Sequence, residues 1–313
     1  MENLFTSMES PLITIFSPTY NAESFLPYVF ETLERQAYKN FEWLVVDDCS
    51  TDNTIRVLKA LQSKASFPIR IIQNETNQMV TKNIELGIHN AKGKFLYLTG
   101  HDDGLKDDCL STFVDDWNKL DAKTQDNICG LVYHCEDQNG NFIGTKYPFD
   151  YWISNDFEMR FKYDVKGEKS SFHKVEILKK IQYSYPEIDV YIPENLFWFE
   201  LSYRYNFMYI NKVLRIYFQH DSHQNISKSI GPGKKYMAGF SFFFSEIIRK
   251  YNIYLRKNYF KMWVIFHFNY IRYSRYNLQS FAAIIKNAEN KKTVAILIPI
   301  VVIFELIKFR RFI

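Results

Sequence analysis

The sequence FEWLVVDDCSTDNT, residues 41–54, is the clearest indication of the fold class of this chain. Its apolar run at residues 43–46 is followed at once by Asp47 and Asp48, and the residues after the turn return to helical spacing. A short apolar run bounded by turn-forming residues is typical of a buried strand. The stretch therefore predicts a strand that ends in two carboxylates and leads into a helix.

The same strand–helix unit recurs on both sides of this stretch. Apolar runs at residues 12–16, 69–72 and 95–98 alternate with segments of helical period. Repeated units of this kind predict an α/β fold with a mostly parallel sheet flanked by helices. The periodicity weakens over residues 139–193, where we expect an inserted loop or a short antiparallel section, and a last strand is predicted at 213–218.

Composition and charge divide the chain into two regions. Of the 313 residues 47% are hydrophobic, which excludes disordered and fibrous proteins. Residues 1–225 carry 23 basic and 32 acidic side chains, whereas residues 226–313 carry 16 basic and only 3 acidic ones. We therefore predict one α/β domain over 1–225 and a basic, aromatic helical region over 226–313, which is expected to meet an anionic surface.

The C-terminal region contains an apolar run, residues 294–304, with basic residues on both sides. Roughly 20 apolar residues are needed to span a bilayer. We predict amphipathic helices over residues 236–313 that dock on the membrane without crossing it. The alternative is that these helices pack on the body of the protein or form a homodimer interface. Aromatic blocks such as residues 240–244 are typical of buried helix faces, which argues against binding of nucleic acid.

The four cysteines indicate a reducing compartment. Cys49, Cys109, Cys129 and Cys135 lie too far apart for CxxC pairs, and the N-terminus lacks a basic segment followed by an apolar one. We expect four free, mostly buried thiols. The predicted location is the cytoplasmic face of the inner membrane, as a peripheral protein.

Polar and acidic residues follow three of the predicted strands. Tyr20 comes after the first strand, Asp47 and Asp48 after the second, and Asp102 and Asp103 after the fourth. Because the carboxyl ends of parallel strands meet at one edge of a sheet, these residues should converge. Carboxylates there suit Mg²⁺ or Mn²⁺, which bind oxygen ligands and bridge phosphates. The pattern predicts a site for a nucleotide diphosphate. It lacks the glycine-rich loop of dinucleotide oxidoreductases and P-loop enzymes.

These motifs resemble those of inverting glycosyltransferases of family 2, whose nucleotide-sugar-binding fold is called GT-A. The resemblance covers the first hundred or so residues and continues more weakly, in a pattern similar to that of enzymes that build bacterial surface polysaccharides. It does not cover the last 88 residues. The matching positions are residues 17–21, 33–54, 82–83, 87, 91–93 and 100–103, then 167–169, 192–198 and 214–217.

The resemblance implies a donor site at the first strands. Pro18 and Tyr20 would flank the nucleotide base, and Asp48, beside Asp47, would accept a hydrogen bond from the ring N–H of the base. Lys82 would help to hold the pyrophosphate. From the residues alone, the alternative for the acidic pair is a helix cap, although Ser50 or Asp52 fits that role better.

The resemblance also implies a metal ligand and a catalytic base. Asp102 would replace the carboxylate that ends the family's Asp-x-Asp motif, with Asp103 beside it, and Glu194 would be the base. Gly100 stands where the family has the first Asp of that motif, and Asn195 where many relatives have the Asp of a Glu-Asp pair. The alternative for Glu194 is a solvated carboxylate at a helix N-terminus.

Weaker candidates lie near these motifs. Glu168 and Lys169 are candidates for contact with the donor or the acceptor. His101 is interpreted as a hydrogen-bonded bystander. A polar cluster after the last strand is the remaining candidate, for acceptor or diphosphate contact or as an ordinary loop: His220, Asp221 and His223.

The predicted activity is transfer of a sugar from a nucleotide-diphosphate sugar, by default a UDP-sugar, to a hydroxyl of a glycan or lipid-linked glycan in bacterial surface polysaccharide synthesis. A carboxylate removes the acceptor proton as the oxygen attacks the anomeric carbon, which inverts its configuration. Mn²⁺ or Mg²⁺ would neutralise the leaving group. The alternative, motivated by Gly100 and Asn195, is a catalytically inactive nucleotide-sugar-binding or scaffold protein at the membrane.

Overall fold

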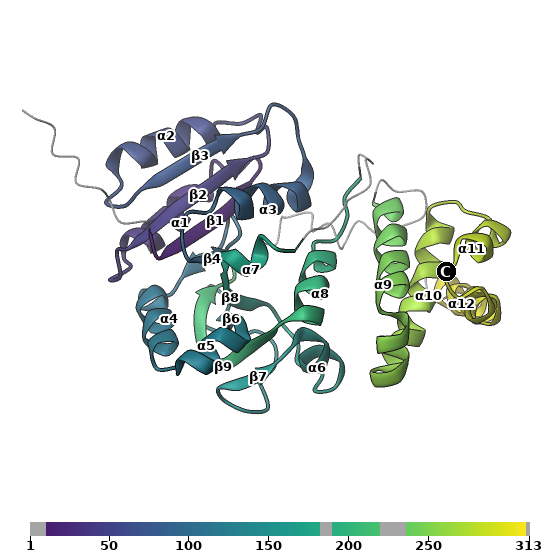
Figure 1. Ribbon diagram of the computed structural model, residues 1–313. Helices are drawn as coiled ribbons and strands as arrows, with labels where there is room; N and C mark the ends of the chain where they lie inside the picture. Colours follow the sequence, from purple (N-terminus) through teal and green to yellow (C-terminus); the bar gives the residue numbers. More distant parts are fainter. Residues whose placement is uncertain (1–10, 182–189, 220–235, 311–313) are drawn as a thin grey trace, which may run out of the picture. The chain divides into compact units, whose positions relative to one another are not determined.

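The computed structural model describes residues 11–181, 190–219 and 236–310, which form two compact units (Figure 1). The described part of the first unit comprises residues 11–181 and 199–219. The described part of the second comprises 190–198 and 236–310. Helix α8, Asn195–Arg204, contributes residues to both units.

The first unit is built on a nine-stranded sheet in the order β3-β2-β1-β4-β8-β6-β9-β5, with β7 paired to β9 outside this path. Strands β1 to β4 are mutually parallel, and β8 runs antiparallel to both of its neighbours, β4 and β6. The strands are β1 (Ile13–Thr19), β2 (Phe41–Asp47), β3 (Ile69–Gln73), β4 (Phe95–Leu98), β5 (Gly104–Leu105), β6 (Ile128–Glu136), β7 (Trp152–Ser154), β8 (Lys169–Lys174) and β9 (Asn206–Ile216).

The predicted α/β fold is confirmed, the sheet is mixed, and residues 139–193 supply the short antiparallel section that the sequence predicts as one alternative. The four apolar runs of the first hundred residues are β1 to β4, but the weakly periodic segment 139–193 supplies β8 at the centre of the sheet. Strand β8 escapes a search for apolar periodicity because polar side chains fill all but one of its buried positions, the exception being Phe172. Ser170, for example, is fully buried and its Oγ lies 2.9 Å from Tyr97 Oη.

Helices cover both faces of the parallel half of the sheet (Figure 1). Ile13 and Ile15 of β1 belong to a core that includes residues of α1 and α2, whereas Phe16, of opposite orientation on the strand, contacts α3. A Cβ at Gly87 of α3 would lie 2.4 Å from the Phe16 ring, so the glycine permits this close approach. The helices of this unit are α1 (Leu26–Glu34), α2 (Thr54–Lys64), α3 (Met79–Asn90), α4 (Cys109–Asn118), α5 (Ala122–Asn127), α6 (Asp156–Phe161) and α7 (Val175–Leu178), together with part of α8.

The second unit is helical, as predicted. It contains α9 (Met237–Asn258), α10 (Phe260–Tyr276), α11 (Phe281–Asn287) and α12 (Lys291–Arg310). The Ser241 and Ser274 hydroxyls, 2.7 Å apart, join α9 to α10. Glu305 fixes α12 to α10 by accepting hydrogen bonds from Arg272 Nε (2.6 Å) and Tyr276 Oη (2.6 Å). Among the described helices, none has both the length and the apolar character that crossing a membrane requires.

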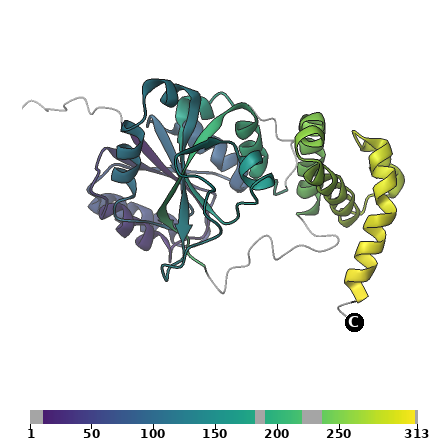
Figure 2. The same cartoon turned by 90° about the horizontal axis from the view of Figure 1, so that it is seen from below.

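Helix α12 presents apolar side chains on both of its sides. Val294 and Val301 are buried against the other helices. Ile296, Ile300, Ile303 and Ile307 are 53–70% exposed, and their spacing of three or four residues puts them on one side of the helix. We call these four residues the outer face of α12. Figure 2 shows α12 as one long helix, in yellow.

Candidate functional site

The carboxyl ends of three parallel strands meet at one edge of the sheet, as predicted. The β1–β2 ladder aligns Thr19 with Asp47, and the Asp48 N–H donates to the Thr19 carbonyl (2.8 Å). On the other side of β1, the Thr99 N–H donates to the Phe16 carbonyl (3.0 Å). The residues after β1, β2 and β4 are therefore neighbours, and we call this region the carboxyl edge.

The loops of the carboxyl edge have a strained backbone and are joined to one another by hydrogen bonds. Asn21, Cys49 and Met79 have left-handed backbone conformations, with φ of 48°, 62° and 65°. Asn21 Oδ1 accepts a hydrogen bond from the Thr51 N–H (2.8 Å), and the Asn21 N–H donates to Ser50 Oγ (2.9 Å). Non-glycine residues in this conformation are uncommon and cluster at ligand sites. The local backbone is thus typical of a binding site.

Asp47 is fully buried and organises the turn after β2. Its carboxylate accepts hydrogen bonds from the N–H (3.1 Å) and the hydroxyl of Ser50. The N-cap position of α2 is Asn53, and the Asp52 carboxylate before it accepts from the Thr54 N–H (2.9 Å) at the start of the helix. Asp47 therefore shapes the edge from within, and its predicted part in donor binding stays a prediction.

Asp48 anchors the N-terminus of α3. Its Oδ1 accepts hydrogen bonds from Asn74 Nδ2 (2.9 Å) and the Gln78 N–H (2.6 Å), and its Oδ2 accepts from the Met79 N–H (2.9 Å). The side chain is 4% exposed. Three of the roughly four lone-pair positions of a carboxylate are thereby used. The remaining acceptor capacity is what a nucleotide base could use.

The other predicted donor contacts have accessible surfaces. Tyr20 is exposed, and Pro18 is half-buried beside it. Lys82 is exposed on α3, where its Nζ lies 3.5 Å from Gln78 Oε1. These side chains can reach a ligand without rearrangement of the core.

The acidic loop after β4, residues 100–103, is tied to β9. Asp103 Oδ1 accepts a hydrogen bond from the Phe218 N–H (3.0 Å), and Asp103 Oδ2 pairs with the Arg215 guanidinium. Burial alone would lower the pKa of Arg215, but the adjacent Asp103 carboxylate outweighs it and raises this pKa above its ordinary value. Asp102 is half-buried, and its Oδ1, like Asp103 Oδ2, faces the Cα of Gly100.

His101 turns away from the two carboxylates. Its Nδ1 lies 3.4 Å from the Pro18 carbonyl oxygen, and its ring packs against Phe25 with 5.9 Å between centroids. The contacts are those of a side chain that fills space between the loops after β1 and β4. This geometry supports the bystander interpretation.

Glu168 and Lys169 lie at the start of β8, which the antiparallel pairing with β4 brings to the carboxyl edge. Lys169 Nζ donates to the carbonyls of Lys166 (2.8 Å) and Gly167 (3.0 Å), and burial lowers the pKa of Lys169 to about 8. Glu168 is exposed. Burial, and then the negative charge of Glu168, raise the pKa of Tyr217, so these groups share one electrostatic environment.

Glu194 belongs to the second unit and stands directly before α8. Its Oε2 accepts a hydrogen bond from Tyr191 Oη (2.9 Å), and its backbone carbonyl accepts from the Phe197 N–H (3.0 Å). The pKa of Tyr191 is raised by burial and by this carboxylate. The predicted helix start is confirmed, and the catalytic role stays a prediction. The cluster His220, Asp221 and His223 lies outside the described residues.

Comparison with known proteins identifies the family. The profile described as Glycosyl transferase family 2 matches residues 14–182, more than half of the chain. The chain belongs to this family. This glycosyl transferase family 2 chain is 27% identical to GalNAc(5)-diNAcBac-PP-undecaprenol beta-1,3-glucosyltransferase of Campylobacter jejuni over 214 residues, 68% of this chain and 67% of that protein. Two other curated relatives, each 29% identical, are matched over only 45% and 43% of their own length.

Solved structures support the GT-A fold. S. aureus TarS 1–349 in complex with UDP-GlcNAc superposes with a TM-score of 0.58 at 17% identity, over 83% of this chain and 81% of that one. The mannosyltransferase PcManGT from Pyrobaculum calidifontis, in complex with GDP-Man and Mn²⁺, superposes with a TM-score of 0.52 at 15% identity, over 93% of this chain and 79% of that one. The family and the fold expected from the sequence are thus confirmed.

The carboxyl edge fits a divalent ion only in company with a ligand. Within the described parts of the chain, no three His, Cys, Asp or Glu side chains are grouped closely enough to hold a metal. Mg²⁺ is commonly bound through one or two protein carboxylates plus substrate phosphates. Asp102 and Asp103, whose oxygens both face Gly100, offer such an incomplete set. A diphosphate would have to complete it.

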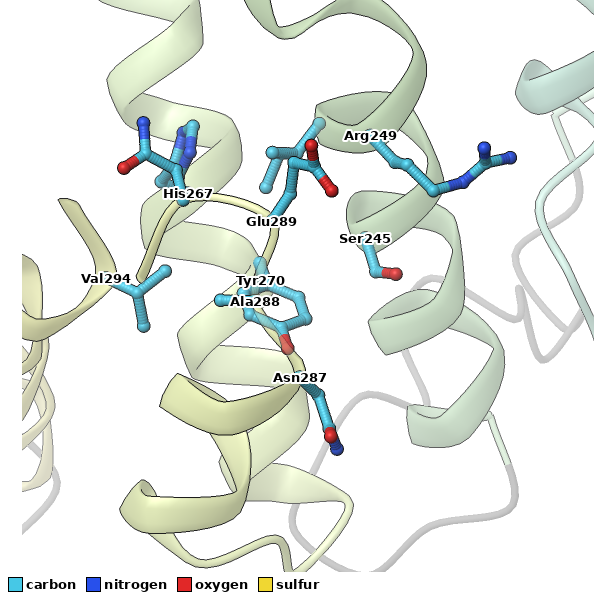
Figure 3. Close-up of a pocket in the computed structure, with 10 residues that line it drawn as sticks. Ser245, Arg249, His267, Tyr270, Asn287, Ala288, Glu289 and Val294 are labelled. Carbon is cyan, nitrogen blue, oxygen red and sulfur yellow. The ribbon is translucent and has the colours of Figure 1, made fainter. Parts of the chain in front are cut away.

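A cavity of about 50 Å³ lies inside the second unit (Figure 3). His267 lines it, with Nδ1 2.8 Å from the Trp263 carbonyl oxygen and with no hydrogen-bond partner at Nε2 among the described residues. Burial lowers the pKa of His267. The volume suits ordered water, whereas ligand pockets measure roughly 300–1,000 Å³. None of the predicted site residues lines this cavity.

Arg215 is the residue of the carboxyl edge to which the sequence assigned no role. It lies in β9 and contacts Asp103 across 112 positions of sequence. The available signal was a single cation inside the apolar run VLRIYF, residues 213–218. A charge at the end of a buried strand requires a partner, and the acidic loop provides it.

Proposed function

We propose that this chain transfers a sugar from a nucleotide-diphosphate sugar, by default a UDP-sugar, to a hydroxyl of a glycan or lipid-linked glycan acceptor, with inversion at the anomeric carbon. The observation that carries the proposal is the convergence of Tyr20, Asp48 and the acidic loop on one strained sheet edge of a family 2 chain. The GT-A domain is taken as residues 1–225, and the C-terminal region as residues 226–313.

The donor is proposed to lie along the carboxyl edge. Pro18 and Tyr20 pack against the base, and Asp48, supported by Asp47, accepts from the ring N–H of the base. Lys82 reaches the pyrophosphate from α3. Because Asp48 holds the first turn of α3, the base and pyrophosphate contacts are set by one rigid element.

Glu194 is proposed as the general base. A carboxylate that removes the acceptor proton during attack commonly contributes a rate factor of about 10²–10⁴. The hydrogen bond from Tyr191 Oη orients the side chain. Glu168 and Lys169 are proposed to contact the donor or the acceptor.

A bound Mn²⁺ or Mg²⁺ would neutralise the negative charge that develops on the departing nucleotide diphosphate. Asp102 would hold it, with Asp103 beside it. Related proteins support this donor and acceptor chemistry: TarS is in complex with UDP-GlcNAc, PcManGT is in complex with GDP-Man and Mn²⁺, and the Campylobacter jejuni relative is named for an undecaprenol-linked substrate.

The test is turnover of labelled nucleotide-sugars in the presence of Mn²⁺ with extracted lipid-linked glycans as acceptors. Transfer of label to the acceptor supports the proposal. Binding of UDP without transfer or hydrolysis of any donor would favour the catalytically inactive nucleotide-sugar-binding or scaffold protein.

We further propose that the protein acts at the cytoplasmic face of the inner membrane, held by the outer face of α12. Four exposed isoleucines form a continuous apolar stripe, and the exposed Lys291 and Lys292 stand at its start. An in-plane helix with basic residues at its ends gains apolar burial and attraction to anionic lipids. A homodimer through the C-terminal helices is the alternative occupant of this face.

A further inference from the structure

We propose that helix α9 of the second unit takes part in catalysis: Gly239 and Phe240 hold Tyr191 in place, and Tyr191 thereby positions the carboxylate of Glu194. The inference rests on the proposed role of Glu194 as the general base. Tyr191, Glu194 and α9 all belong to the second unit. This unit would then serve the reaction itself, besides the proposed docking on a membrane.

The backbone of Glu194 is fixed by the start of α8, but its side chain is not. The Glu194 carbonyl accepts hydrogen bonds from the N–H groups of Phe197 (3.0 Å) and Trp198 (3.4 Å). A glutamate has several rotatable side-chain bonds, so a fixed backbone still leaves the carboxylate a choice of rotamers. The Tyr191 hydroxyl donates to Glu194 Oε2 at 2.9 Å. This hydrogen bond selects one position of the half-buried carboxylate.

The backbone of Tyr191 lies directly against α9 at Gly239. A Cβ at position 239 would overlap the Tyr191 carbonyl oxygen and lie 2.8 Å from the carbonyl carbon. Gly239 is buried in the first turn of the helix. Any larger residue there would have to push the Tyr191 segment away. The glycine therefore allows a contact that fixes where this segment lies on α9.

The ring of Tyr191 packs against aromatic side chains at the start of α9. Its centroid lies 6.0 Å from that of Tyr236 and 6.1 Å from that of Phe240, both in edge-to-face geometry. Phe240 is itself stacked on Tyr273 of α10, with 4.9 Å between centroids. Such aromatic pairs are favourable and have a preferred geometry. Helices α9 and α10 thus fix the ring, and with it the direction of the hydroxyl.

The chemistry of the contact suits a positioning residue. Burial, and then the negative charge of Glu194, raise the pKa of Tyr191, so its hydroxyl stays protonated and donates at neutral pH. A general base must lie within hydrogen-bond reach of the proton that it removes. With Glu194 Oε2 held by Tyr191, Oε1 is the oxygen that would receive the proton of the acceptor hydroxyl.

The contact between Tyr191 and α9 is tested on the full chain without substrate. Alanine is a better helix former than glycine, so without this contact Gly239→Ala would raise the Tm. We expect the Tm to fall instead, by on the order of 5 °C, and the amides of residues 190–198 to exchange with deuterium about 10-fold faster or more. Unchanged exchange, or a raised Tm, would overturn the contact whether or not the proposed function holds.

The positioning role is tested by turnover with Mn²⁺, extracted lipid-linked glycans and the labelled nucleotide-sugar that the unmodified chain transfers. Tyr191→Phe keeps the ring and loses the hydroxyl. It should lower kcat by about 10–100-fold and leave the donor KM and the Tm nearly unchanged. In a Glu194→Gln background it should have no further effect, because Tyr191 acts through that carboxylate. Equal losses in the two backgrounds would overturn the role.

The matched control for the aromatic contact is Phe242→Leu. Phe242 is half-buried like Phe240, but two positions along a helix place it about 200° around the axis. Phe240→Leu should lower kcat a few-fold, and Phe242→Leu should leave it nearly unchanged. Equal kcat values for the two variants would overturn the part of Phe240.

Two outcomes separate this inference from the proposed function. Normal turnover in Glu194→Gln would overturn the base and its positioning, but not the transfer activity. Absence of turnover in the unmodified chain would count against the proposed function, and the exchange of residues 190–198 would still decide the contact with α9.

Discussion

The acidic loop of the first unit and the outer face of α12 in the second depart from ordinary burial in opposite directions. In the loop, the charged Asp103 and Arg215 are withdrawn from solvent and satisfy each other. On α12, isoleucines remain in solvent although Val294 and Val301 of the same helix are buried. Buried charges and contiguous exposed apolar groups are the two observations that demand an explanation.

The two regions differ in how much of their capacity to interact is still unsatisfied. Most polar side chains of the carboxyl edge already form hydrogen bonds within the protein. A ligand there therefore meets only a few groups, whose positions are fixed. The isoleucines of the outer face of α12 are exposed among the described residues of the unit, so their burial against another surface would still contribute favourable free energy. Chemistry at the first region and docking at the second can therefore be tested separately.

The largest effect is expected at the proposed base. Glu194→Gln should reduce turnover by about 10²–10⁴, because the amide cannot accept the acceptor proton. UDP affinity should be retained, as should the Tm. Turnover with a competent acceptor and calorimetric UDP binding measure the two separately. Asn195, the exposed residue that follows Glu194, provides the control, because Asn195→Ala should leave turnover near normal. Near-normal turnover in the Glu194 variant would refute the role.

Docking should fail when the outer face of α12 is made polar. The double variant Ile300→Glu and Ile307→Glu should lower binding to vesicles that contain anionic phospholipid by about 100-fold or more, since each buried isoleucine contributes roughly 1.5–3 kcal/mol. Vesicle co-sedimentation measures the effect. Ile253→Glu alters a still more exposed isoleucine on α9 and should change little. Unchanged co-sedimentation, combined with a dimer that dissociates in the variant, would assign this face to a second copy.

The Tyr20 ring should contribute a smaller part of the binding free energy of the donor. Base–aromatic stacking is worth about 1–3 kcal/mol on substitution by alanine, so Tyr20→Ala should weaken UDP binding by roughly 10-fold or more. Tyr20→Phe, which keeps the ring, should bind UDP nearly as the original chain does. A phenylalanine variant as weak as the alanine variant would show that the hydroxyl, not the ring, matters.

The smallest effect is a pH dependence at Lys169. Burial lowers its pKa from the usual 10.5 to about 8, so its positive charge is present below that pH and is lost as the pH rises through it. If Lys169 contacts the diphosphate, UDP affinity should fall a few-fold between pH 7 and pH 9. Lys169→Arg stays protonated and should show a flatter profile. Parallel profiles for the two proteins would remove Lys169 from the donor contacts.

The sequence was sufficient for the features that depend on periodicity. Strands β1 to β4, the meeting of their carboxyl ends and the helical C-terminal region all follow from apolar spacing that tertiary contacts do not override. The position of β8 could not be predicted, because its buried serine is satisfied by Tyr97, a residue far away in the chain. The role of Arg215 was hidden for the same reason, since its partner is 112 residues away.

The residues alone do not distinguish Asp102 from Asp103, although the family resemblance implies that Asp102 is the metal ligand. They are adjacent and chemically identical, and only the pairing of β5 with β9 turns one of them towards Arg215. Likewise, the burial of Asp48 under the first turn of α3 depends on residues 74–79, which carry no recognisable motif. Identity of side chains is read from sequence, but their hydrogen-bond partners are a property of the fold.

The hydrogen bonds between Asp48 and the N-terminus of α3 couple the position of that helix to the carboxyl edge. A ligand that displaces the Asp48 carboxylate would also displace the amides of Gln78 and Met79, which donate to it. Lys82 lies on the next turn of the same helix. In the proposed donor site, a base that displaces Asp48 would therefore also displace Lys82. If Asp48 binds the base and Lys82 the pyrophosphate, as proposed, α3 couples the choice of nucleotide to the binding of its phosphates.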